Sequence, residues 1–248
     1  MLKLLLLLPC FIFAYDLNNL DEIYQAPSLF HIFGTDYLGR DVFLRILIAI
    51  KNSLLAGVIC SFLTIFFGIF YVFLARFSFY NFFINLLNMF LALPSFIFIM
   101  LFQSFFQGGI LEMIFIIALG HWAYVAKIID TKINYFEKMD FYECALVLGC
   151  SKIRAFFKEF IRACFGIFSV LFVINIIHFI YSESLLSFFG IGFSVNTPSL
   201  GNLLNEANQA FIYGAWWAVF FPIMAIFLIV LFLFYISSIL QNYFGEKL

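Results

Sequence analysis

The stretch FYECALVLGCSKIRAFFKEFIR, residues 141–162, interrupts a chain that is otherwise suited to lipid. Six charged side chains lie in it around Gly149, whereas charged residues make up only 11% of the whole 248-residue chain. Hydrophobic residues make up 65% of the chain, while a soluble domain is roughly 45–50% apolar. The chain therefore has too little polar surface to cover a globule, and its composition predicts an all-α polytopic membrane protein.

Polar residues, glycines and prolines divide the chain into six apolar runs, which are the candidate membrane spans. These spans are about 3–17, 47–75, 82–106, 110–129, 163–182 and 214–240. Crossing the hydrocarbon takes about 20 helical residues, and the first run is shorter than that and contains Pro9. Its length is that of a signal-peptide core. Because no small-x-small cleavage site follows, we interpret it as a short retained span, with cleavage as the alternative.

The distribution of cations predicts the orientation of the chain. Seven of the 13 Lys and Arg residues lie in 127–162, and none lies in 183–213. Cytoplasmic loops carry an excess of Lys and Arg, so we expect a multi-pass membrane protein with both termini in the cytoplasm. The segment 130–162 is then a cytoplasmic loop, while 18–46 and the hairpin 183–213 lie on the opposite side of the membrane. The whole chain is predicted to form a single membrane domain.

The 141–162 stretch has the pattern of two helices joined by a glycine turn. Gly149 suits the position after a helix end, where φ is positive, and Ser151 is a candidate N-cap of the next helix. That second helix carries cations at i, i+4 and i+8 beside phenylalanines. These cations are Arg154, Lys158 and Arg162. We expect this helix to lie at the bilayer surface, with its cations near anionic headgroups.

The pattern Glu143-x-Ala145-x-x-x-Gly149 resembles the EAA loop of ATP-binding-cassette importer permeases, the cytoplasmic element that docks on the ATPase subunit. This chain departs from the family pattern at Cys144, where the family has alanine, and at 161–162, where the family favours Leu-Pro. The resemblance implies an ATPase-coupling loop. Its residues would be Glu143, Ala145, Gly149 and Ser151.

Two longer blocks extend the resemblance. HIFGTDYLGRDVFLR (31–45) is similar to the HPFGTDxLGRDxxSR block of permeases in dipeptide, oligopeptide and nickel importers, and LSFFGIGFSVNTPSLGNLLNEA (186–207) is similar to their LSFLGLGxxxPTPxWGxML block. The likeness covers about 20–240 and points to the C-type subunit. It implies a type I importer permease fold with about six transmembrane helices in the bacterial inner membrane, so that 18–46 and 183–213 would be periplasmic. The family-motif residues are Gly34, Thr35, Asp36, Gly39, Arg40, Asp41, Gly190 and Gly192.

The same two blocks carry local structural signals. The glycines of the first block allow tight turns, and Thr35 or Asp36 is predicted to cap the helix that enters the membrane. Asp41 and Arg45 are predicted i,i+4 partners at the outer interface. The two glycines of the second block break an apolar run, as a re-entrant hairpin facing a cavity requires.

Ionisable residues within spans are functional hypotheses by default. The candidates for the substrate path are His121, His178 and Glu183. Imidazole is a preferred ligand of Ni²⁺, and both histidines lie in sequence contexts similar to nickel-type permeases, so we lean toward nickel as the cargo. The alternatives are a dipeptide or oligopeptide permease with no metal role and two structural histidines. Glu183 is predicted either to cap the hairpin or to face the substrate.

The resemblance implies a non-catalytic subunit that forms half of a translocation pathway. A second permease subunit would complete the pore, cytoplasmic ATP-binding subunits would hold ATP and Mg²⁺, and an extracytoplasmic binding protein would deliver substrate. The sequence contains no G-x-x-x-x-G-K-[ST] phosphate loop, so we expect this chain to need no cofactor of its own. It also shows no sign of nucleic-acid binding. The rival classes are an intramembrane enzyme and a stand-alone channel or secondary carrier.

Overall fold

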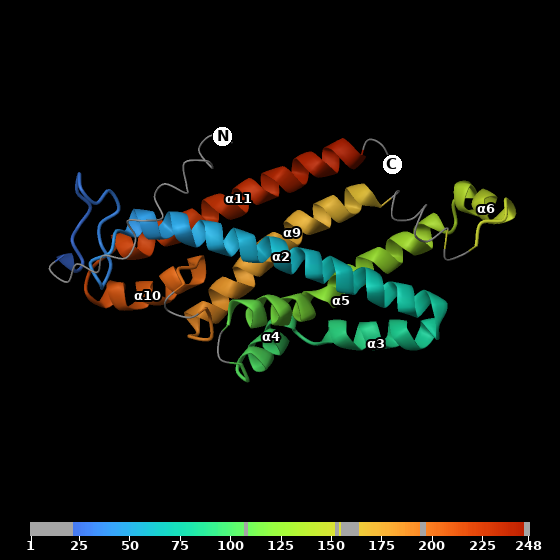
Figure 1. Cartoon of the computed structure of the whole chain (residues 1–248), viewed down its shortest axis with the longest axis horizontal. Coiled ribbons are helices and arrows are strands. Elements are labelled where there is room, and N and C mark those ends of the chain that lie inside the picture. Colours follow the sequence, from blue (N-terminus) through green and yellow to red (C-terminus); the bar gives the residue numbers. More distant parts are fainter. Residues whose placement is uncertain (1–21, 107–108, 152–153, 155–163, 194–196, 246–248) are drawn as a thin grey trace. The chain divides into compact units, whose positions relative to one another are not determined.

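The computed structural model describes residues 22–106, 109–151, 154, 164–193 and 197–245. This part of the chain is helical, and no β-strand is present within it. Its helices are α2 (Val42–Phe77), α3 (Tyr80–Ala92), α4 (Ser95–Gln103), α5 (Ile110–Phe136), α6 (Asp140–Val147), α9 (Phe165–Phe188), α10 (Leu200–Ile212) and α11 (Trp217–Gly245), as Figure 1 shows. The predicted all-α fold class is confirmed.

Four of the described helices, α2, α5, α9 and α11, are long and apolar enough to cross a membrane. The helices α3 and α4 together could form a fifth span, but they are bent by 81°. The candidate span predicted at about 82–106 is therefore divided between two helices with a break at Leu93 and Pro94. Leu93 has an extended backbone (φ −84°, ψ 134°), because the residue before a proline is pushed out of the helical region. The predicted span 3–17 lies outside the described residues.

The helix α2 is longer than a bilayer requires. Its 36 residues give a length of about 54 Å at 1.5 Å per residue, against a hydrocarbon core of about 30 Å. Its first and last turns carry Arg45 and Arg76. Both ends of α2 can therefore leave the lipid and present cations to polar partners.

The chain forms two compact units, each built from several segments. The first unit comprises Met1–Gly57, Gln103–Ile114 and His178–Phe232, and the second unit comprises Val58–Phe102, Phe115–Ile177 and Leu233–Leu248. In the second unit, a Cβ on Gly68 would lie 2.9 Å from the side chain of Val125. Small residues of this kind let transmembrane helices approach closely, and here glycine brings α2 against α5.

The first unit packs the loop before α2 onto the start of α11. The Phe33 ring stacks on the Phe221 ring with centroids 3.9 Å apart, and the Trp217 indole N–H donates to the Thr35 carbonyl at 3.2 Å. Gly34 has φ +71°, and a Cβ there would lie 2.6 Å from the Trp217 ring. The loop therefore needs glycine at this position for both its backbone and its packing.

Candidate functional site

The loop before α2 is organised around Asp36. Its Oδ1 accepts the backbone N–H groups of Leu38 and Arg40 at 2.8 and 2.9 Å, and its Oδ2 accepts the Arg40 Nε at 2.7 Å. The prediction that Thr35 or Asp36 caps the membrane-entering helix is wrong. The capping residue is Asp41, whose Oδ1 accepts the Leu44 N–H at 3.1 Å.

A buried ion-pair network joins this loop to α10. The Arg45 side chain, only 1% exposed, donates to Asp36 Oδ2 at 2.6 Å and to Glu206 Oε1 at 2.7 Å, with a further bond to Glu206 Oε2. Arg40 lies 3.7 Å from Glu206. The sequence predicted Asp41 as the partner of Arg45, but the Asp41 carboxylate contacts His31 Nδ1, at 2.9 Å. The network contains two arginines and two carboxylates, so its formal charges cancel.

Glu183 lies in a second polar cluster, which joins α9, α2 and the start of α10. Its carboxylate is 0% exposed and accepts the Ser199 hydroxyl at 2.6 Å and the Ser187 hydroxyl at 3.2 Å. The Ser53 hydroxyl at 3.4 Å and the Gly201 N–H at 3.3 Å complete its contacts. The first turn of α10 adds a favourable field for a negative charge. These contacts connect α9 to α2 and to the start of α10, so Glu183 stabilises the hairpin between α9 and α10.

The hydrogen bonds of Glu183 predict the effect of removing its charge. Glu183→Gln is expected to lower the free energy of unfolding by about 1–3 kcal/mol, because an amide nitrogen cannot accept the Gly201 N–H or the serine hydroxyls. Thermal unfolding of the purified chain in detergent measures the effect. Glu112→Gln is the control, since Glu112 is exposed. A Glu183→Gln unfolding midpoint equal to that of the control would contradict this role.

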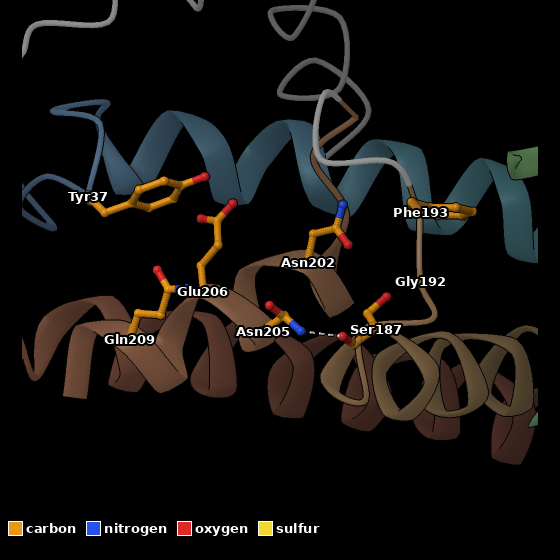
Figure 2. A pocket seen from close by; sticks show the side chains of 9 residues that line it. Tyr37, Ser187, Gly192, Phe193, Asn202, Asn205, Glu206 and Gln209 are labelled. Carbon is orange, nitrogen blue, oxygen red and sulfur yellow. Dashed lines mark hydrogen bonds between the residues drawn. The ribbon is translucent and has the colours of Figure 1, made fainter. Parts of the chain in front are cut away.

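A pocket of about 220 Å³ opens beside these clusters in the first unit. It is lined by Tyr37, Ser187, Gly190, Gly192, Phe193, Asn202, Asn205, Glu206 and Gln209. Figure 2 shows Glu206 and Gln209 pointing from α10 toward Tyr37. The Asn205 amide donates to the Ser187 carbonyl at 2.7 Å, which fixes α10 against the end of α9.

The predicted family-motif glycines have two distinct roles beside this pocket. Gly190 has φ +78°, and its N–H donates to the Ser187 carbonyl at 2.9 Å, which closes the end of α9. A Cβ on Gly192 would collide with the Ser187 side chain. The hairpin therefore turns at Gly190 and passes closely over Ser187 at Gly192. In the first block, Gly39 also has a positive φ, +73°.

The predicted coupling residues lie at α6 and the turn that follows it. Glu143 and Ala145 belong to α6, and Gly149 has φ +88°, positive as predicted. The Ser151 hydroxyl accepts the Arg154 N–H at 3.4 Å, while most of the predicted basic helix lies outside the described residues. Val147 and Leu148 are each 87% exposed, so this element presents two apolar side chains.

The two predicted histidines are placed in different units. His121 lies in α5 and His178 in α9, and both are half-buried. Within the described part of the chain, no group of three or more His, Cys, Asp and Glu side chains could hold a metal ion. The structure therefore adds no support for a metal site at either histidine.

The sequence interpretation missed a polar network in the second unit. Arg76 Nη1 donates to Glu137 at 2.7 Å, and its Nη2 donates to Asp130 at 2.9 Å and Asn134 at 2.7 Å. The Tyr80 ring lies 4.9 Å from the Arg76 guanidinium, and the Tyr80 hydroxyl contacts Asp130 at 3.2 Å. A signal for this network was present in the sequence, because Asp130, Asn134 and Glu137 follow one another at i, i+4 and i+7 at the end of α5. Glu206 had no comparable local signal.

Comparison with known proteins matches residues 64–248 to the family described as "Binding-protein-dependent transport system inner membrane component". Among similar proteins, the dipeptide transport system permease protein DppC of Bacillus subtilis is 26% identical over 208 residues, which cover 83% of this chain and 65% of DppC. The oligopeptide transport system permease protein OppC of Bacillus subtilis is 24% identical over 213 residues, covering 85% of this chain and 70% of OppC.

The glutathione transport system permease protein GsiD of Escherichia coli is 29% identical over 223 residues, covering 88% of this chain and 73% of GsiD. The chain thus spans about two thirds of the length of DppC. The family match covers most of this chain, including α5, α6 and the hairpin between α9 and α10. The chain therefore belongs to the binding-protein-dependent transport system inner membrane components, which confirms its identification as a permease subunit of an ATP-binding-cassette importer.

Proposed function

We propose that this chain forms half of the translocation pathway of an importer for dipeptides or oligopeptides. The similar proteins are named for dipeptide, oligopeptide and glutathione transport, and glutathione is itself a short peptide. The earlier lean toward nickel has no support in these comparisons. Peptide is therefore the substrate class that we favour.

A second permease subunit completes the pore in this proposal, and an extracytoplasmic binding protein delivers the peptide. Cytoplasmic ATP-binding subunits hold ATP and Mg²⁺, so this chain performs no chemistry. Both termini and α6 lie on the cytoplasmic side, where the excess of Lys and Arg predicts them. The hairpin between α9 and α10 then lies on the periplasmic side.

One observation carries the proposed coupling to the ATPase. Val147 and Leu148 are each 87% exposed at the end of α6, and they lie in the sequence between Glu143 and Lys152. Exposed apolar side chains rimmed by polar residues mark protein interaction sites, and a short helix of this kind fits a groove on a partner. Closure of the ATPases on ATP would then move α6 and bias the spans between two global states.

Gly149→Val tests the coupling. The left-handed backbone costs a non-glycine residue roughly 1–2 kcal/mol, and φ +88° at Gly149 is strained for a β-branched side chain. Among the described residues other than its two chain neighbours, none has an atom within 4 Å of a Cβ built on Gly149, so we expect the change to act mainly through the backbone. We expect peptide transport per ATP hydrolysed to fall severalfold in proteoliposomes that contain the complete importer.

Gly149→Asn is the matched control, because asparagine tolerates the left-handed region better than valine does. It is expected to retain most of the transport. Normal coupling of hydrolysis to transport in Gly149→Val would count against the docking role. Transport that continues without ATP or the ATPase subunits would instead indicate a channel or secondary carrier.

A further inference from the structure

The polar face of α10 is the main wall of the pocket described above. Asn202, Asn205, Glu206 and Gln209 all line it, and they follow one another at i, i+3, i+4 and i+7, which is one face of a helix. The buried face of the same helix is formed by Leu200, Leu203, Ala207 and Ala210. The helix therefore packs through small and apolar residues and turns carboxamides toward the pocket.

The pocket is polar but close to neutral. Among the described residues that line it, the one carboxylate is that of Glu206, which is paired with the buried guanidinium of Arg45. The neighbouring Asp36 is paired with Arg40 and Arg45. The other polar side chains are three carboxamides, the Ser187 hydroxyl and the phenol of Tyr37. Such a lining suits an uncharged hydrogen-bonding ligand better than a metal ion, which prefers charged oxygen or imidazole ligands.

A carboxamide offers both a carbonyl acceptor and two N–H donors, so it matches the donor and acceptor of a peptide group. The volume of about 220 Å³ is below the roughly 300–1,000 Å³ of pockets that enclose a whole drug-sized ligand. The pocket can therefore hold one or two residues of a peptide. Gly190 and Gly192 contribute no side chain to the wall, which leaves room for main chain and small side chains.

We propose that this pocket binds main-chain groups of the transported peptide on its way into the pore, with Gln209 as a principal contact. The inference rests on the proposed function. Contacts to the main chain do not depend on the side chains of the cargo, as an importer of varied peptides requires. Gln209 is exposed, and among the described residues its carboxamide has no hydrogen-bond partner, so it is available to a ligand.

The test is uptake of trialanine by the complete importer in proteoliposomes with its binding protein. Gln209→Met keeps the side-chain length and removes both hydrogen-bonding groups. We expect the maximal uptake rate to fall about threefold to tenfold, the effect of one lost hydrogen bond. Asn208→Met is the matched control, because Asn208 is equally an exposed residue of α10 and does not line the pocket.

A trialanine analogue methylated at the amide nitrogen of its central residue provides the second arm. It lacks one main-chain donor, so its uptake should differ less between Gln209→Met and the unmodified importer than the uptake of trialanine does. Equal uptake of trialanine by Gln209→Met and Asn208→Met would overturn the proposal. So would a Gln209→Met defect that disappears at saturating binding protein, which would assign the pocket to docking. An unmodified importer that fails to take up trialanine would refute the proposed function instead.

Discussion

Arg45→Met is expected to lower the free energy of unfolding by roughly 3–5 kcal/mol, the usual cost of removing one partner of a buried ion pair. Arg45 is 1% exposed and is bonded to Asp36 and Glu206. With methionine at this position, Arg40 would be the remaining cation of the network for the carboxylates of Asp36 and Glu206. Reversible unfolding of the purified chain in mixed micelles measures the loss.

The double variant Arg45→Met with Glu206→Gln is expected to recover much of that stability. It removes one charge of each sign and leaves Asp36 paired with Arg40 at 2.7 Å. Arg154→Met is the control for the loss of an arginine, because Arg154 is exposed and surface changes usually stay within about 0.5 kcal/mol. A single variant as stable as Arg154→Met would show that the network contributes little.

Arg76→Met is expected to have an effect of similar size, roughly 3–5 kcal/mol, in the second unit. It would leave Asp130, only 3% exposed, with Tyr80 and Asn134 as its remaining described partners. Glu137 would also lose its contact, and it lies three residues before α6. We therefore expect transport per ATP hydrolysed to fall as well, because the end of α5 would no longer be fixed to α2.

Arg76→Met with Asp130→Asn is the matched double variant, since it removes both members of the buried pair. It should unfold at a higher temperature than Arg76→Met alone. If the two variants unfold at the same temperature, the loss of stability in Arg76→Met does not come from an unpaired Asp130 carboxylate. If transport stays coupled in a chain that is measurably destabilised, the network supports the fold without transmitting motion to α6.

The sequence predicted the positions of the four long apolar helices closely, because each of them forms from one continuous run of apolar residues. The predicted spans 47–75, 110–129, 163–182 and 214–240 correspond to α2, α5, α9 and α11. The helix break before Pro94 was not predicted, because hydropathy stays high through 82–106. Local backbone chemistry was also readable, since Gly149 and Gly190 have the positive φ that a turn glycine adopts.

Partner choice among charged residues could not be predicted in the same way. The sequence offered Arg45 a local partner, Asp41, four residues away. In the structure Arg45 pairs with Glu206, 161 residues away, and Asp41 caps α2 and contacts His31. Glu206 carries no signal of its own, because its role depends on which face of α10 turns toward the loop before α2.

By itself, then, the sequence determined that this chain is a membrane permease subunit with a glycine turn beside its charged stretch. Composition, turn residues and motifs are local properties, and each can be read without knowing what packs against it. Only the tertiary structure decided that Glu183 is fully enclosed by hydroxyls and an N–H, and that α10 turns three carboxamides into a pocket. Hydrogen bonds and ion pairs between distant segments form only after the helices have packed.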